Sequence, residues 1–406
     1  MIISKRERNL NGGIYHQTSL ICNASRIGIM EFQILRQLES EYKEFLNPLE
    51  SYKQNLLAIR ENLKGVAGEN FVGNWLNAFS YTGSPVVVNL DHNVSSSKNL
   101  DEMVEGSRNA VDEMEQIVKA TSGHMSGYKM NRQSMLTFLI AGEPYFVKDT
   151  RELFREECKN RFHVDADPVI WTDEKIGDIP STAYQTARII YNLGYDAVHC
   201  MPQIGPDVAG AVQLAAEEQG MKGVIHVVDM THDGYSYVKE HYFKDGEKTV
   251  NLLRENALGN LETEVNIGRK EKSKVKIRAT AAIEPANRPI EIFQSRKIYG
   301  NNLAIISIGI GKEQRAWPGS AIYAGADIEG VGRFVFKGTD GKLDNPENIA
   351  EKARACKMSA LRALKARVER KPYPFDDVRE ELGKFVFPLR EDTKEQLGIV
   401  YDKSLT

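Results

Sequence analysis

The chain has 406 residues, of which 41% are hydrophobic and 27% are charged, a balance typical of a soluble globular protein with a large core. Its 53 basic and 56 acidic residues leave a formal net charge of only −3, which disfavours nucleic acid and anionic membranes as partners. The sequence has no apolar run of membrane-spanning length, no signal-peptide-like start and no C-x-x-C pair among its four cysteines; we therefore expect a cytoplasmic protein without a zinc site.

The first predicted element is helical. Apolar residues from Leu35 to Leu63 are separated alternately by three and four positions, the pattern of a helix that packs on another helix. Pro48 is expected to kink or split this segment. We predict that residues 1–82 form a helical extension lying on the rest of the protein, with a self-associating coiled coil as the alternative.

From about residue 84 the pattern changes to short β-branched runs, each followed by a polar turn and a helical stretch. Most runs are apolar on both faces, as buried parallel strands are. Eight such units predict an α/β fold, a (β/α)8 barrel over residues 83–370. A doubly wound open sheet is the alternative, and the absence of G-x-G-x-x-G after the first run disfavours it. The runs span residues 86–91, 127–130, 168–173, 196–201, 223–230, 275–283, 303–309 and 326–332.

The end of the chain is predicted to be an appendage of this barrel. Residues 345–366 have the apolar spacing of a helix, which would be the eighth barrel helix. Residues 371–406 follow it and carry enough apolar side chains to pack on the barrel. The sequence gives this C-terminal extension no role.

Charged residues stand at the ends of three neighbouring runs. Asp173 and Lys175 are two residues apart, so in a strand they point to the same face. Lys129 and Asp91 end the runs before them, where barrel active sites are assembled. Buried charges of both signs must pair, which predicts an alternating Lys-Asp array. The alternative is an ion-pair network with a purely structural role.

Asp178 follows this group, close to the start of the next predicted helix. Pro180 suits the first helical turn. Asp178 could join the charges at the barrel mouth, or it could simply cap the free N–H groups of that helix.

The last two runs predict an anion site. Gly309-Ile310-Gly311 follows the seventh run, and Gly332-Arg333 ends the eighth. Exposed backbone N–H groups and a guanidinium can bind phosphate oxygens together, and barrels often bind phosphate after these two strands. The four histidines near strand ends have no metal-ligand spacing, so we expect hydrogen-bonded structural roles for them. They are His92, His199, His226 and His232.

These residues resemble a known family. DEKIGDIPST at residues 173–182 resembles the D-x-K-x-x-D-I-P-x-T signature of orotidine 5'-phosphate decarboxylases, a family of (β/α)8 barrels. VVVNLD, GYKM, VHCMPQIGPD, MTHDG, EPANRP, SIGIG and GVGR follow the motif order of its archaeal branch. The match runs from about residue 86 to 336, so both terminal segments lie outside it.

The resemblance implies decarboxylation of orotidine 5'-monophosphate to UMP without metal or cofactor. It implies that Lys175 donates the proton to C6 of the pyrimidine, that Asp173 lies against the leaving carboxylate, and that Lys129 and Asp91 contact the ribose. It also implies a homodimer whose two active sites are shared across the interface.

Further binding residues are implied by the same motifs. Asp178, Ile179 and Thr182 would come from the partner subunit. Thr231 would bind the pyrimidine, and Gly332 with Arg333 would hold the phosphate.

The phosphate-side loop departs from the family pattern. The family usually has a glutamine that bridges base and phosphate, whereas Glu313 stands at the directly counted position. Either the loop shifts by one residue and uses Gln314, or Lys312 compensates for the acidic charge.

Two other functions remain open at this point. A related enzyme acting on sugar phosphates, a decarboxylase or aldolase that uses magnesium, shares the D-x-K-x-x-D array. A non-catalytic nucleotide-binding scaffold is the alternative from another class.

Overall fold

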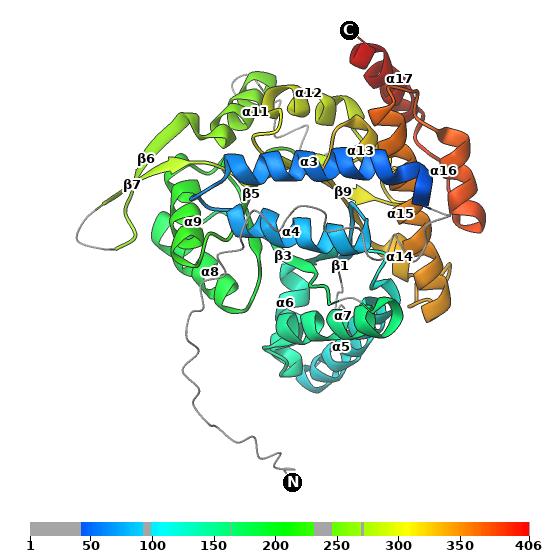
Figure 1. Ribbon diagram of the computed structural model, residues 1–406. Coiled ribbons are helices and arrows are strands. Elements are labelled where there is room, and N and C mark those ends of the chain that lie inside the picture. Colours follow the sequence, from blue (N-terminus) through cyan, green and yellow to red (C-terminus); the bar gives the residue numbers. More distant parts are fainter. Residues whose placement is uncertain (1–41, 92–98, 164, 231–245, 269–271, 406) are drawn as a thin grey trace. The chain divides into compact units, whose positions relative to one another are not determined.

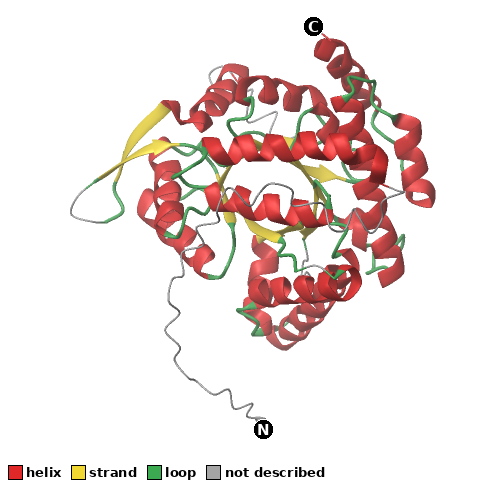
Figure 2. Ribbon diagram, in the orientation of Figure 1, coloured by secondary structure: helices red, strands yellow, loops and turns green. Residues whose placement is uncertain are grey.

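Eight parallel strands form a closed barrel, in the order β1-β10-β9-β8-β5-β4-β3-β2 (Figures 1 and 2). The computed structural model describes residues 42–91, 99–163, 165–230, 246–268 and 272–405. The predicted (β/α)8 barrel is therefore confirmed, and the open sheet is excluded. The barrel strands are β1 (Val86–Leu90), β2 (Gly127–Asn131), β3 (Val169–Ile176), β4 (Ala197–Cys200), β5 (Gly223–Val227), β8 (Ala281–Pro285), β9 (Ala304–Ile310) and β10 (Ile328–Val331).

The predicted strand at residues 275–283 is wrong as a single element. Residues Ser273–Ile277 form β7, which pairs antiparallel with β6 (Leu261–Val265) in a separate hairpin. The sixth barrel strand is β8, which starts four residues later. Buried and exposed positions alternate in β7, where Lys274 and Lys276 are exposed, whereas every residue of β8 is buried. The prediction thus merged a hairpin strand that has one solvent-exposed face with a barrel strand that is buried on both faces.

Helices follow the barrel strands and cover the outside of the barrel. Several begin with a side-chain cap: Asn99 accepts a hydrogen bond from the Glu102 N–H, and Asn345 accepts one from Asn348. α8 begins instead with Pro180, which has no N–H to satisfy. The helices are α5 (Leu100–Thr121), α6 (Arg132–Ala141), α7 (Phe146–Phe162), α8 (Pro180–Asn192), α9 (Pro206–Glu218), α11 (Gly246–Glu255), α12 (Pro289–Tyr299), α13 (Ser320–Ala324), α14 (Arg333–Phe336) and α15 (Pro346–Val368).

Two helices, α3 (Leu46–Asn62) and α4 (Glu69–Thr82), lie against the end of the barrel where the strands begin (Figure 1). The Tyr52 hydroxyl donates to the backbone oxygen of Asp327, just before β10. The Asn74 amide donates to Asp196, just before β4, over 3.1 Å. Over the described part of the predicted seam, from residue 42 to Leu63, the apolar side chains are therefore buried within this chain, among them Phe45, Leu49, Tyr52, Leu56 and Ile59. Residues 1–41, the first half of the predicted helical extension, lie outside the described residues.

The helical segment is split just before Pro48, which is one of the two outcomes expected there. The short 3-10 helix η2 (Lys43–Phe45) is followed by a separate helix, α3, which begins at Leu46 and has Pro48 in its first turn. A proline there removes no hydrogen bond, because the first N–H groups of a helix have no partner within it.

The C-terminal residues contact the barrel helices. After α15 come α16 (Phe375–Leu382), the short helix η4 (Gly383–Phe385) and α17 (Glu391–Leu405). The Trp317 indole donates to the backbone oxygen of Phe387 over 2.7 Å, and α17 packs on α12. Among the described helices, none combines the length and apolarity needed to cross a membrane.

Candidate active site

Four charged side chains form a chain of ion pairs where β1, β2 and β3 end. The Lys129 ammonium lies 3.1 Å from Asp173 Oδ2 and 3.3 Å from Asp91 Oδ1. The Lys175 ammonium lies 2.5 Å from the other oxygen of Asp173. We call Asp91, Lys129, Asp173 and Lys175 the charge array. The structure thus brings together four of the residues selected from the sequence, with alternating charge.

Burial and pairing act in opposite directions on the array. Lys129 is only 2% exposed, and burial alone would lower its pKa, but Asp173 and Asp91 outweigh burial and raise the pKa of Lys129. Burial alone would raise the pKa of Asp173, but His199, Lys129 and Lys175 outweigh it and hold the pKa of that carboxyl well below its usual range. Lys129 and Asp173, at the centre of the array, therefore both stay charged near neutral pH.

His199 is a member of this site that the sequence did not assign to it. It lies on β4, fully buried, with Nδ1 2.7 Å from Asp173 Oδ1 and Nε2 3.1 Å from the Trp171 Nε1. An indole N–H can only donate, so Nε2 accepts and Nδ1–H donates to Asp173. Burial lowers the pKa of His199 despite the carboxylate. A neutral imidazole thus holds one oxygen of Asp173 in place.

The signal that could have found His199 is its position in the buried run Ala197–Cys200, beside the strand that carries Asp173. His226 is also buried, and its Nδ1 has no hydrogen-bond partner among the described residues, so the hydrogen-bonded role expected for it is not seen at that atom. Burial lowers the pKa of His226 to about 4. His92 and His232 lie outside the described residues.

The backbone of Lys175 is strained. Its φ of 47° lies in the left-handed region, which costs a non-glycine residue about 1–2 kcal/mol. The register between β3 and β4 also shifts here, since Thr172 pairs with Val198 but Ile176 pairs with Cys200. Asp173 and Lys175 do meet, but through an irregular strand end rather than the regular alternation that was expected. Such strain is concentrated at functional sites.

The Lys175 side chain remains accessible. It is 42% exposed, whereas its partner Asp173 is mostly covered. A ligand at the mouth of the barrel can therefore reach the Lys175 ammonium while the ion pair with Asp173 holds that ammonium in place.

Asp178, Ile179 and Thr182 lie at the exposed start of α8 and make no hydrogen bond or ion pair with the array among the described residues. The Asp178 carboxylate accepts a hydrogen bond from the Ile179 N–H over 2.7 Å. Asp178 does not cap α8, because the N-cap residue is Ile179 and no side chain caps the helix. The Ile179 side chain is unusually exposed for its type, at 63%.

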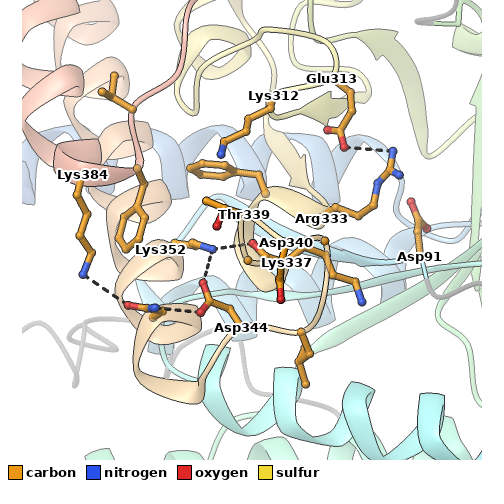
Figure 3. A pocket seen from close by; sticks show the side chains of 17 residues that line it. Asp91, Lys312, Glu313, Arg333, Lys337, Thr339, Asp340, Asp344, Lys352 and Lys384 are labelled. Carbon is orange, nitrogen blue, oxygen red and sulfur yellow. Dashed lines mark hydrogen bonds and ion pairs between the residues drawn. The ribbon is translucent and has the colours of Figure 1, made fainter.

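At the predicted phosphate site, Arg333 forms an ion pair with Glu313. Gly332 precedes α14, and Arg333 is its first residue. The Arg333 guanidinium lies 3.2 Å from the Glu313 carboxylate, and both side chains are about half exposed (Figure 3). Gln314 is half-buried next to Glu313, but the side chain that contacts Arg333 is that of Glu313. Thr231 lies outside the described residues.

Comparison with known proteins decides the family. Residues 109–343 match the model of the orotidine 5'-phosphate decarboxylase / HUMPS family. The chain belongs to this family. The resemblance inferred from the motifs is thereby confirmed, and the chain is a carbon-carbon lyase by membership. The family match leaves out Asp91 and both terminal segments.

Archaeal orotidine 5'-phosphate decarboxylases are among the relatives of this chain. The orotidine 5'-phosphate decarboxylase of Methanosarcina mazei is 30% identical over 55% of this chain and 87% of its own length. That of Methanosarcina barkeri is 31% identical over 46% of this chain and 71% of its own length.

Solved structures of the family were matched as well. The decarboxylase of Methanocaldococcus jannaschii, in complex with the inhibitor BMP, is 18% identical with a TM-score of 0.47, over 68% of this chain and 98% of that one. The Pyrococcus horikoshii decarboxylase is 20% identical with a TM-score of 0.43, over 70% of this chain and 99% of that one.

Proposed function

We propose that this protein decarboxylates orotidine 5'-monophosphate to UMP, the last step of de novo pyrimidine synthesis, in the cytoplasm and without metal or organic cofactor. The observation that carries the proposal is the accessible Lys175 ammonium held by Asp173 at the mouth of a barrel of this family. The archaeal relatives named for this reaction support it.

The charge array suits the chemistry. Loss of CO2 leaves an electron pair on C6 of the pyrimidine, and a fixed ammonium beside that carbon stabilises the charge as it forms and then protonates it. Asp173 orients Lys175, and Lys129 keeps Asp173 ionised. His199 is a positioning residue, because it contacts Asp173 and not the ammonium.

A metal-free assay tests this function directly. With EDTA present, the purified protein should consume orotidine 5'-monophosphate, followed as loss of the orotate-ring absorbance. Turnover of a sugar phosphate that stops in EDTA would instead support the magnesium-dependent relatives. Nucleotide binding without any turnover would support the scaffold.

We propose further that the active site is shared between two subunits. Asp178, Ile179 and Thr182 are exposed beside the array but do not join it within one chain. The exposed Ile179 supports a partner surface because other exposed isoleucines lie near it, and grouped exposed apolar residues mark interaction sites. Ile189 on α8 and Ile204 nearby are similarly exposed and would extend that surface.

Mixing two inactive variants tests the shared site. Asp178→Ala and Lys175→Ala should each be inactive, but a mixed dimer would contain one site with both native residues. After random subunit exchange, about a quarter of the sites should work again, measured by the absorbance assay. The absence of recovery after exchange has been confirmed by mass spectrometry would contradict the shared site.

The ion pair between Glu313 and Arg333 predicts an effect on phosphate binding. Glu313→Gln should tighten UMP binding roughly two- to fivefold, because the substrate phosphate no longer competes with an exposed carboxylate for the guanidinium. Titration calorimetry measures the change. In an Arg333→Ala background the gain should vanish, and an equal gain there would show that Glu313 acts elsewhere.

A further inference from the structure

A hollow of about 1000 Å³ opens beside the array, at the phosphate side of the barrel mouth. Asp91, Glu313 and Arg333 line one end, while residues 337–344, α15 and residues 384–386 line the other (Figure 3). Lys129, Asp173 and Lys175 are not among its described lining residues. The space therefore continues past Arg333, away from the reacting groups and toward the C-terminal segment. We call it the outer hollow.

Five cationic side chains from separate elements line the outer hollow, together with four carboxylates, those of Asp91, Glu313, Asp340 and Asp344. Lys352 is buried and already has partners, because its ammonium donates to Asp344 over 2.7 Å and to the backbone oxygen of Lys337 over 2.8 Å. Asp344 also accepts a hydrogen bond from the Asn348 amide. The five cationic lining residues are Lys312, Arg333, Lys337, Lys352 and Lys384.

Two of these cations are available to a ligand. Lys312, in the loop after β9, is exposed and has no ion pair among the described residues. Lys384, on η4, is exposed and lies 2.8 Å from Glu351, which is itself exposed. Exposed pairs of this kind contribute little to stability, so a phosphate can displace Glu351. Thr339, also exposed, is a further polar residue in the lining (Figure 3).

We propose that the outer hollow binds the second and third phosphates of nucleoside 5'-diphosphates and triphosphates. This rests on the proposed function, because the first phosphate must lie at Arg333. From there the chain of phosphates runs toward Lys312 and Lys384, whose ammonium groups suit phosphate as point charges. Such nucleotides occupy the active site without being turned over and compete with the monophosphate. The C-terminal segment thus contributes a binding residue.

Calorimetry with UMP, UDP and UTP tests the proposal on the full chain, with EDTA present so that no magnesium complex forms. The wild-type protein should bind UDP and UTP about tenfold or more tightly than UMP, as expected for one added charge-assisted hydrogen bond. Lys384→Glu should remove most of the advantage of UTP and leave UMP affinity within about twofold of wild type, because Arg333 and Lys384 line opposite ends of the hollow. Lys384→Arg should retain it.

The matched control is Lys64→Glu, which reverses an exposed charge on the α3–α4 connection at the other end of the barrel. UMP binding with no advantage for UDP or UTP, or an equal loss in Lys64→Glu, would overturn the outer-hollow proposal alone. Failure of all three nucleotides to bind would overturn the proposed function with it.

Discussion

Lys175→Ala should lower the turnover of orotidine 5'-monophosphate roughly a thousandfold or more, because it removes both the charge beside C6 and the proton that C6 receives. The fold should persist. The Lys175 side chain is 42% exposed, and Asp173 keeps Lys129 and His199 as partners. Steady-state absorbance measurements and circular dichroism check the two halves of this prediction.

Lys175→Gly separates catalysis from backbone strain. It should be as inactive as the alanine variant, but more stable than it by about 1 kcal/mol, because glycine adopts a φ of 47° without penalty. Urea unfolding compares the two variants. Full activity in either would remove Lys175 from the mechanism, and equal stability would mean that the left-handed backbone stores no strain.

Arg254→Met should be the most destabilising of these substitutions. The Arg254 guanidinium is 1% exposed and binds Glu284, at the end of β8, through two hydrogen bonds of 2.9 and 3.1 Å. It also contacts Glu291 on α12. Glu284 is fully buried, so removal of Arg254 leaves a carboxylate without its counter-charge. We expect a loss of about 3–5 kcal/mol in the free energy of unfolding at pH 7.

The pH dependence of this loss has a defined sign. Burial already raises the pKa of Glu284 in the native protein, although Arg254 opposes it. Without Arg254 the pKa of Glu284 rises further in the folded variant. Near neutral pH, Glu284 must therefore either bind a proton or remain a buried unpaired charge when the variant folds, whereas it is ionised in water in the unfolded chain. The deficit should be largest near neutral pH and shrink as pH falls toward the usual range of a glutamic acid.

Urea unfolding of the Arg254→Met variant at pH 5 and pH 7 measures this effect. Adding Glu284→Gln should recover part of the stability, because no buried charge then remains. The matched control is Arg155→Met, which removes a more exposed arginine paired with Asp165 and Asp167 and should change stability by no more than about 1 kcal/mol. Similar losses in both arginine variants would contradict the role of burial.

The sequence was sufficient for the barrel and for the charge array. Parallel strands covered on both faces leave continuous apolar runs, so seven of the eight runs coincide with barrel strands. Charges that end neighbouring runs must meet at one end of a barrel, which placed Lys129 beside Asp173.

The remaining features depend on tertiary packing. A buried histidine on a strand has no distinctive spacing, so His199 was not assigned to Asp173. The merged strand at residues 275–283 arose because β7 and β8 both contain buried apolar residues and only three residues separate them. The left-handed Lys175 has no signal in residue type, since lysine does not favour that conformation. The pairing of Glu313 with Arg333 depends on how two loops meet.

The position of β1 has a consequence for how far this protein can be shortened. β1 pairs with β10 on one side and with β2 on the other, yet it precedes the segment that matches the family model, which starts at residue 109 within α5. A fragment trimmed to that segment would lose the strand that closes the ring. Two unpaired strand edges would then be open to other chains, and such edges promote aggregation.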